Sequence, residues 1–206
     1  EADGRRLPLA LPLIGRHNVY NALAATSAAL SLGVQPEVIV SALSKAKPVR
    51  GRLEEVPCGK PYRVFIDYAH TEDALENALL ALRDGCKGRI ILVFGCGGNR
   101  DGSKRVPMGR VAARLADLPI ITTDNPRGEN PLDIIMEISK GCDEIGKRRH
   151  TIQSRREAIA AALAEAEEGD VVLVAGKGHE RTQEFESTVV PFSDRDVIME
   201  LTGMGS

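Results

Sequence analysis

The run Ile90-Ile91-Leu92-Val93-Phe94 decides the fold of this chain, because consecutive apolar residues are typical of a strand covered on both faces of a sheet. Val171-Val172-Leu173-Val174 has the same character. Strand and helix patterns alternate around both runs, which predicts an α/β fold with right-handed βαβ units in an open, mostly parallel sheet with helices on both faces. The predicted strands are 63–67, 89–94, 119–122, 150–152 and 170–175, and the predicted helices are 72–82, 107–115, 131–141, 155–167 and a last one after Ser193.

The first 50 residues have a different pattern. The apolar stretch from Leu7 to Ile14 predicts a strand. A helix with Asn18 as N-cap follows and stops at Gly33, and a second helix starts at Pro36 and ends before residue 48. Apolar residues lie on nearly every face of the first helix, which indicates burial between two layers. This segment is too small to bury that surface alone, so we expect a domain boundary near residue 50 and a longer parent protein.

Composition argues against several classes of protein. The 206 residues have a net charge of −2, and 3% of them are aromatic, so neither a basic surface nor a base-stacking platform for nucleic acid is indicated. No apolar run reaches the length of a membrane span, and no signal peptide is recognisable. The four cysteines have no C-x-x-C spacing, which favours reduced thiols in a cytoplasmic protein.

A stiff turn, Asp124-Asn125-Pro126-Arg127, follows the predicted strand at 119–122. Pro126 restricts the preceding residue to extended geometry, and Pro131 opens the next helix. Arg127 therefore lies on a rigid loop at the carboxyl end of a strand, where a guanidinium can bind a carboxylate or phosphate through two hydrogen bonds. The alternative is an ordinary Asx-Pro turn with a solvated arginine.

Polar and glycine-rich loops follow four of the predicted strands. In an open α/β sheet, ligands bind beyond the carboxyl ends of the strands, so these loops predict one shared site. The loops are 67–71, 95–105, 124–127 and 176–180.

Three common kinds of site are not favoured. The glycine loop from Gly95 has Arg100 where a G-x-G-x-x-G motif needs its third glycine. None of the Gly-Lys pairs is followed by Ser or Thr, as a P-loop requires. His70 and His179 have no third ligand or matching cysteine, so no metal site is predicted.

These loops give the chain a specific resemblance to the Mur ligases of peptidoglycan synthesis, extending from about Gly15 to Leu201. The Asp-Asn-Pro-Arg turn resembles the branch that adds meso-diaminopimelate. The matching runs are GRHNVYN (15–21), GRLE (51–54), DYAHT (67–71), residues 95–105, DNPRGENP (124–131) and GKGHE (176–180).

The resemblance implies a three-domain, ATP-dependent ligase with ATP and Mg²⁺ as cofactors. Residues 1–50 would be the helical tail of the central ATP-binding domain, and residues 51–206 the Rossmann-like C-terminal domain that binds the amino acid. The P-loop, the magnesium ligands and the pocket for the UDP-N-acetylmuramoyl dipeptide would lie in parts absent from this chain. No catalytic residue is therefore assigned here, and the chain alone is expected to be inactive.

The same resemblance assigns two groups of binding residues. The nucleotide would be bound by Asn21, Arg52, Asp67, Tyr68 and His70. In the amino-acid pocket, Arg127 with Arg100 can pair with the distal carboxylate of meso-diaminopimelate, and Glu180 with Asp124 can pair with an ammonium. The whole pocket would consist of Arg100, Asp124, Asn125, Pro126, Arg127, Gly176 and Glu180.

Two other functions stay open on the sequence. A stand-alone module could bind an amino acid or nucleotide without any chemistry. A sister ligase could add lysine instead, although Arg127 argues against it because lysine has no second carboxylate.

Overall fold

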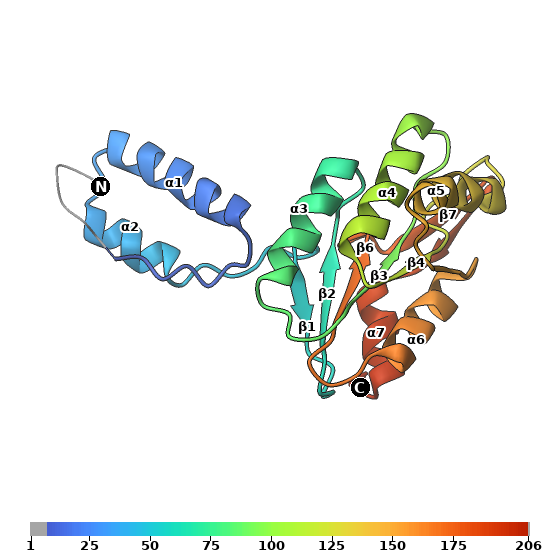
Figure 1. The fold of residues 1–206 in the computed structure, drawn as a ribbon. Helices are drawn as coiled ribbons and strands as arrows, with labels where there is room; N and C mark the ends of the chain where they lie inside the picture. The colour runs from blue at the N-terminus through green and yellow to red at the C-terminus, as the bar shows by residue number, and fades with distance from the viewer. Residues whose placement is uncertain (1–7, 206) are drawn as a thin grey trace. The chain divides into compact units, whose positions relative to one another are not determined.

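The computed structural model describes residues 8–205 (Figure 1). The chain divides into two compact units, one ending at Val49 and one from Arg50 onward. Each unit is described by itself. None of the described helices is long and apolar enough to cross a membrane.

The first unit contains α1 (Arg16–Ser31) and α2 (Pro36–Leu43), as the sequence predicts. The predicted strand is wrong for residues 8–14, which form no strand, and Leu7 lies outside the described residues. The predicted N-cap is also wrong. Gly15 takes that position, and the Asn18 side chain instead donates a 2.8 Å hydrogen bond to the Ile14 carbonyl. An apolar run becomes a strand only when a neighbouring strand takes its hydrogen bonds, and none among residues 8–205 does so for this run.

The two helices of the first unit are poorly covered. Ala22 is the one buried residue of α1, and Ile39 is the one buried residue of α2. Val19, Tyr20 and Leu23 are more than half exposed. The prediction that α1 is buried on nearly every face is therefore not met by the described residues. That a further part of a longer protein covers it stays a prediction.

The second unit is built on a six-stranded sheet, which confirms the predicted fold class. β1 is antiparallel to β2, and the other neighbouring strands are parallel. The order across the sheet is β1 (Glu54–Val56), β2 (Arg63–Asp67), β6 (Val171–Ala175), β3 (Ile90–Phe94), β4 (Leu118–Ile121) and β5 (His150–Thr151). The parallel strands β2, β6, β3 and β4 therefore all end at the same edge of the sheet, its carboxyl edge.

Helices lie on both faces of this sheet (Figure 1). The side chains of Ile159 and Ile198, from the two helices of one face, pack with Val64 and Val172 of the strands. The helices of that face are α6 (Arg155–Glu165) and α7 (Asp194–Thr202), and those of the other face are α3 (Glu72–Arg83), α4 (Arg105–Leu115) and α5 (Pro131–Ile145). The last helix begins after Ser193, as predicted, and the Ser193 hydroxyl caps it by accepting the Asp196 N–H at 3.2 Å.

Three strands were not predicted: β1, and the hairpin formed by β7 (Thr182–Phe185) and β8 (Thr188–Pro191). Both segments are short and polar, and β8 ends in a proline. Apolar periodicity marks strands that are buried on at least one face, so it misses strands like these. The hairpin lies beside the predicted site.

Asp170 links the starts of β6 and β3. Its carboxylate is buried and accepts hydrogen bonds from the Arg89 N–H at 2.6 Å, the Arg89 guanidinium at 2.8 Å and the Glu167 N–H at 3.0 Å. Burial alone raises the pKa of Asp170, but these donors outweigh it and bring the pKa below its usual value.

We expect Asp170→Asn to lower the free energy of unfolding by about 1–3 kcal/mol near neutral pH. Because the folded pKa is depressed, the carboxylate stabilises the fold fully above the unfolded pKa of about 4 and loses this effect as pH falls through the folded pKa. Urea unfolding of both proteins at neutral pH and at the lowest pH where they stay folded measures this. A difference that does not shrink in acid would contradict the prediction.

Candidate functional site

The predicted loops meet at the carboxyl edge of the sheet. The Gly98 N–H donates to the Asn125 carbonyl at 2.8 Å, which joins the loops after β3 and β4. The Gly176 N–H donates to the Asp67 carbonyl at 3.0 Å, which joins the loops after β6 and β2. One cluster of loops thus contains most of the residues that the sequence singles out.

The turn after β4 is held in an unusual conformation. Arg127 has φ 51°, in the left-handed region that non-glycine residues seldom adopt. Its N–H donates to the Glu184 carbonyl at 3.0 Å, and its carbonyl accepts the Glu186 N–H. The guanidinium donates from Nη1 to the Gly98 carbonyl at 3.1 Å, and its Nε lies 2.7 Å from Oε2 of Glu184.

A buried lysine joins two of the predicted pocket residues. Lys177 is fully buried, and its Nζ donates to Oδ1 of Asn125 at 2.8 Å and to Oε2 of Glu180 at 2.9 Å. Nδ2 of Asn125 donates to the same Glu180 oxygen at 2.9 Å. Burial raises the pKa of Glu180, but Lys177 and Asn125 outweigh it, so the pKa is lowered and the carboxylate stays ionised.

Asp124 is the most deeply placed acid of the pocket. Its Oδ1 accepts the Asn125 N–H at 2.8 Å, and its Oδ2 lies 3.9 Å from Nη1 of Arg155. Burial raises its pKa, although Arg155 and Lys177 oppose this. Gly176, with φ 114°, lies against this acid, because a Cβ there would come 2.5 Å from Oδ2. Only glycine fits at that position.

Arg100 and Pro126 complete the predicted pocket. Arg100 and Arg127 both lie beside Gly97. A Cβ on Gly97 would lie 3.0 Å from Nη1 of Arg127 and 4.0 Å from Cγ of Arg100. Arg100 is exposed and makes no hydrogen bond or ion pair with the described residues. Pro126 is buried, and its carbonyl packs so tightly on Gly98 that no side chain fits there.

The residues predicted to bind the nucleotide form a second group in this unit, with one exception. The Tyr68 ring lies 4.8 Å from the ring of His70 and 5.8 Å from that of His179, and the Arg52 guanidinium carbon lies 5.1 Å from its centre. The carboxylate of Asp67 accepts the N–H groups of residues 53 and 69 at 2.7 and 2.8 Å. The exception is Asn21, which lies exposed on α1 in the other unit.

Four residues of the site were missed on the sequence. Arg155 and Asp194 form a fully buried ion pair behind Asp124, with Nε to Oδ1 at 2.7 Å and Nη2 to Oδ2 at 2.8 Å. Lys177 was considered only as a P-loop residue, and Glu184 lies on the unpredicted hairpin. Charged residues next to apolar strands, such as Lys177 after β6, are the one signal that could have indicated buried partners.

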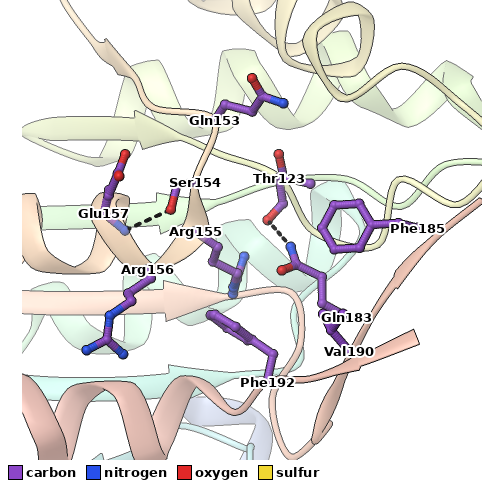
Figure 2. Close-up of a pocket in the computed structure, with 10 residues that line it drawn as sticks. All are labelled: Thr123, Gln153, Ser154, Arg155, Arg156, Glu157, Gln183, Phe185, Val190 and Phe192. Atoms are coloured by element: carbon purple, nitrogen blue, oxygen red, sulfur yellow. Dashed lines mark hydrogen bonds between the residues drawn. The ribbon is translucent and has the colours of Figure 1, made fainter. Parts of the chain in front are cut away.

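The hairpin also borders a cavity of about 570 Å³ between β7 and the start of α6 (Figure 2). Gln183 and Phe185 line it from the hairpin, and Thr123 and Arg155 line it from the sheet edge and α6. Gln183 donates from Nε2 to the Asp124 carbonyl at 2.7 Å. None of the predicted site residues lines this cavity.

The fold and the loop cluster define a Rossmann-like α/β domain with a group of charged side chains at the carboxyl edge of its sheet. Residues 51–178 match the model of the Mur ligase family described as "Mur ligase, glutamate ligase domain". The chain belongs to the Mur ligase family.

Its relatives agree with this assignment. The chain is 50% identical, over 196 residues, to UDP-N-acetylmuramoyl-L-alanyl-D-glutamate--2,6-diaminopimelate ligase of Syntrophomonas wolfei, covering 95% of this chain and 40% of the relative. A solved structure of a ligase of the same name shares 37% identity with a TM-score of 0.74, over 95% of this chain and 40% of that one. A complex of E. coli FolC with ADP shares 26% identity with a TM-score of 0.65, over 85% and 40%. The chain thus spans about two fifths of the length of these relatives.

Proposed function

We propose that this chain is the C-terminal part of a cytoplasmic, ATP-dependent ligase that adds meso-diaminopimelate to UDP-N-acetylmuramoyl-L-alanyl-D-glutamate in peptidoglycan synthesis. The observation that carries the proposal is the cluster of Arg127, Asp124 and Glu180 at one edge of the sheet. The names of the relatives support the substrate. Residues 1–50 would be the tail of a central ATP-binding domain, and residues 51–206 the amino-acid-binding domain.

The charges of the pocket suit a ligand with both signs of charge. Arg127 has Glu184 as a counter-charge and Glu180 has Lys177, whereas Arg155, 3.9 Å from Asp124, is already paired with Asp194. An unpaired buried charge is costly, so the charges of Arg127 and Glu180 are stable without ligand. Meso-diaminopimelate carries two carboxylates and two amino groups. Arg127 and Arg100 would bind its distal carboxylate, and Glu180 and Asp124 an ammonium.

The residues predicted to bind the nucleotide fit the nucleoside of ATP. Asp67 would bind the ribose hydroxyls, because a carboxylate oxygen accepts hydrogen bonds from hydroxyl groups. Beside Asp67, Tyr68 and His70 offer ring faces and Arg52 offers a guanidinium. Asn21 of the first unit would also contact the nucleotide. The chain has no Walker-type loop for the phosphates, so we place that loop and the Mg²⁺ ligands in the remaining part of the ligase.

The contribution of this chain to the reaction would be positioning. The glutamate side-chain carboxylate, activated as an acyl phosphate, reacts with the amine of meso-diaminopimelate. The C–N bond forms, phosphate leaves and the amine loses a proton. A pocket that holds the amine at the reacting carbon replaces a bimolecular encounter, which can supply several kcal/mol of the barrier.

We expect the purified chain alone to form no tripeptide product and to release no phosphate from ATP. A hybrid in which it replaces the matching two fifths of the Syntrophomonas wolfei ligase should do both with meso-diaminopimelate. Mass spectrometry of the product and a phosphate assay measure this, with the intact relative as control. Product from the chain alone, or a folded hybrid that uses no diaminopimelate, would contradict the proposal.

A further inference from the structure

Strand β7 runs along the turn after β4 and is bound to it at several points. The backbone of Arg127 is bonded on both sides, by the Glu184 carbonyl at 3.0 Å and the Glu186 N–H. The Glu184 N–H donates to Oδ1 of Asn125 at 3.1 Å, and Gln183 donates to the Asp124 carbonyl at 2.7 Å. The hairpin therefore supports the left-handed conformation of Arg127, which is costly without such support.

Alternation along β7 sends neighbouring side chains to opposite sides. Gln183 and Phe185 face the cavity shown in Figure 2. Glu184, between them, faces the turn, where its Oε2 lies 2.7 Å from Nε of Arg127. The hairpin thus places one carboxylate directly on the arginine that is proposed to bind a substrate carboxylate.

The contact between Glu184 and Arg127 leaves part of the Arg127 guanidinium available to a ligand. Nε pairs with Glu184, and Nη1 donates to the Gly98 carbonyl. Nη2 donates no hydrogen bond within residues 8–205. The Arg127 side chain is 27% exposed, so a ligand can reach it. A guanidinium held at two nitrogens keeps its plane fixed, and a carboxylate can then bind at the third without further ordering.

We propose that Glu184 is a specificity-determining positioning residue, which orients Arg127 toward the distal carboxylate of the amino acid and shares its charge. This rests on the proposed function, because it assumes that Arg127 binds that carboxylate. Two effects oppose each other. The ion pair at Nε orients the guanidinium, whereas the negative charge of Glu184 weakens the attraction of Arg127 for a second carboxylate.

The two effects can be separated by two substitutions in the hybrid ligase. Glu184→Ala removes both the acceptor and the charge. It should raise the KM for meso-diaminopimelate about twofold to fivefold, the range of an exposed ion pair, and change kcat less. Glu184→Gln keeps an oxygen of the same reach beside Nε but removes the charge, so it should restore the KM to the original value or below. The KM for lysine, which has no second carboxylate, should change in neither variant.

Glu186→Ala is the matched control, because Glu186 is exposed on the same hairpin and contacts the turn only through its backbone. A direct readout comes from NMR of the 206-residue chain without substrate. The Arg127 Nε–H group should have a high order parameter, and so little side-chain motion, in the original chain and in Glu184→Gln, and a lower one in Glu184→Ala.

The outcomes separate the two proposals. A folded hybrid that does not use diaminopimelate overturns the proposed function and the role of Glu184 in specificity with it. A hybrid that uses it, but whose KM is unchanged in Glu184→Ala or rises equally for lysine, overturns the role of Glu184 alone. A mobile Arg127 guanidinium in the original chain, with a low Nε–H order parameter, also overturns it.

Discussion

Replacing Asp194 by asparagine should lower the free energy of unfolding of the second unit by about 3–5 kcal/mol, the usual cost of removing one partner of a buried ion pair. Asp194 and Arg155 have no exposed side-chain surface, and two hydrogen bonds of 2.7 and 2.8 Å join them. Without Asp194, the Arg155 guanidinium would keep the Ala175 carbonyl and the more distant Asp124 as partners. It would remain charged in a dry environment, since an arginine does not release its proton.

Urea unfolding followed by circular dichroism measures this change. Arg156→Ala is a matched control on the same helix, because Arg156 pairs with Glu200 at the exposed surface. Its unfolding midpoint should stay close to that of the original chain, as is common for exposed ion pairs. If Asp194→Asn and Arg156→Ala have equal effects, the buried pair does not support the fold as described.

In the hybrid ligase, Arg127→Ala should reduce kcat/KM for meso-diaminopimelate about tenfold to a few hundredfold, the equivalent of about 1.5–3 kcal/mol for a hydrogen bond to a charged group. Use of lysine should be unchanged or improved, because lysine has no carboxylate for Arg127. The structure also gives a reason for an improvement. Glu184 loses its counter-charge in this variant and is free to attract the ammonium of lysine.

The measurement is the ratio of kcat/KM for the two amino acids. Arg127→Lys should not restore the original ratio, because an ammonium cannot reproduce the planar set of N–H groups that binds Glu184, the Gly98 carbonyl and a ligand together. If the ratio stays constant in Arg127→Ala, the turn has a structural role only, and the proposed substrate loses its strongest support.

The sequence predicted most of the second unit correctly, because its strands and helices are local patterns. The runs around Ile90 and Val171 are apolar over their whole length, as strands covered on both faces must be. It also predicted which loops meet, since parallel strands end at the same edge of a sheet. The patterns failed at the short hairpin of residues 182–191, which no apolar periodicity marks, and at residues 8–14, an apolar run without a neighbouring strand.

The sequence by itself therefore determined the α/β class, the order of the helices and parallel strands in the second unit and the resemblance that indicates a family. The tertiary structure alone decided how the charges of the pocket are paired. Lys177 lies between Asn125 and Glu180, Arg155 behind Asp124, and Glu184 on Arg127. These partners are between 3 and 57 positions apart in the chain. Periodicity reports only on near neighbours, whereas ion pairs depend on distance in space, which the packed sheet and its hairpin establish.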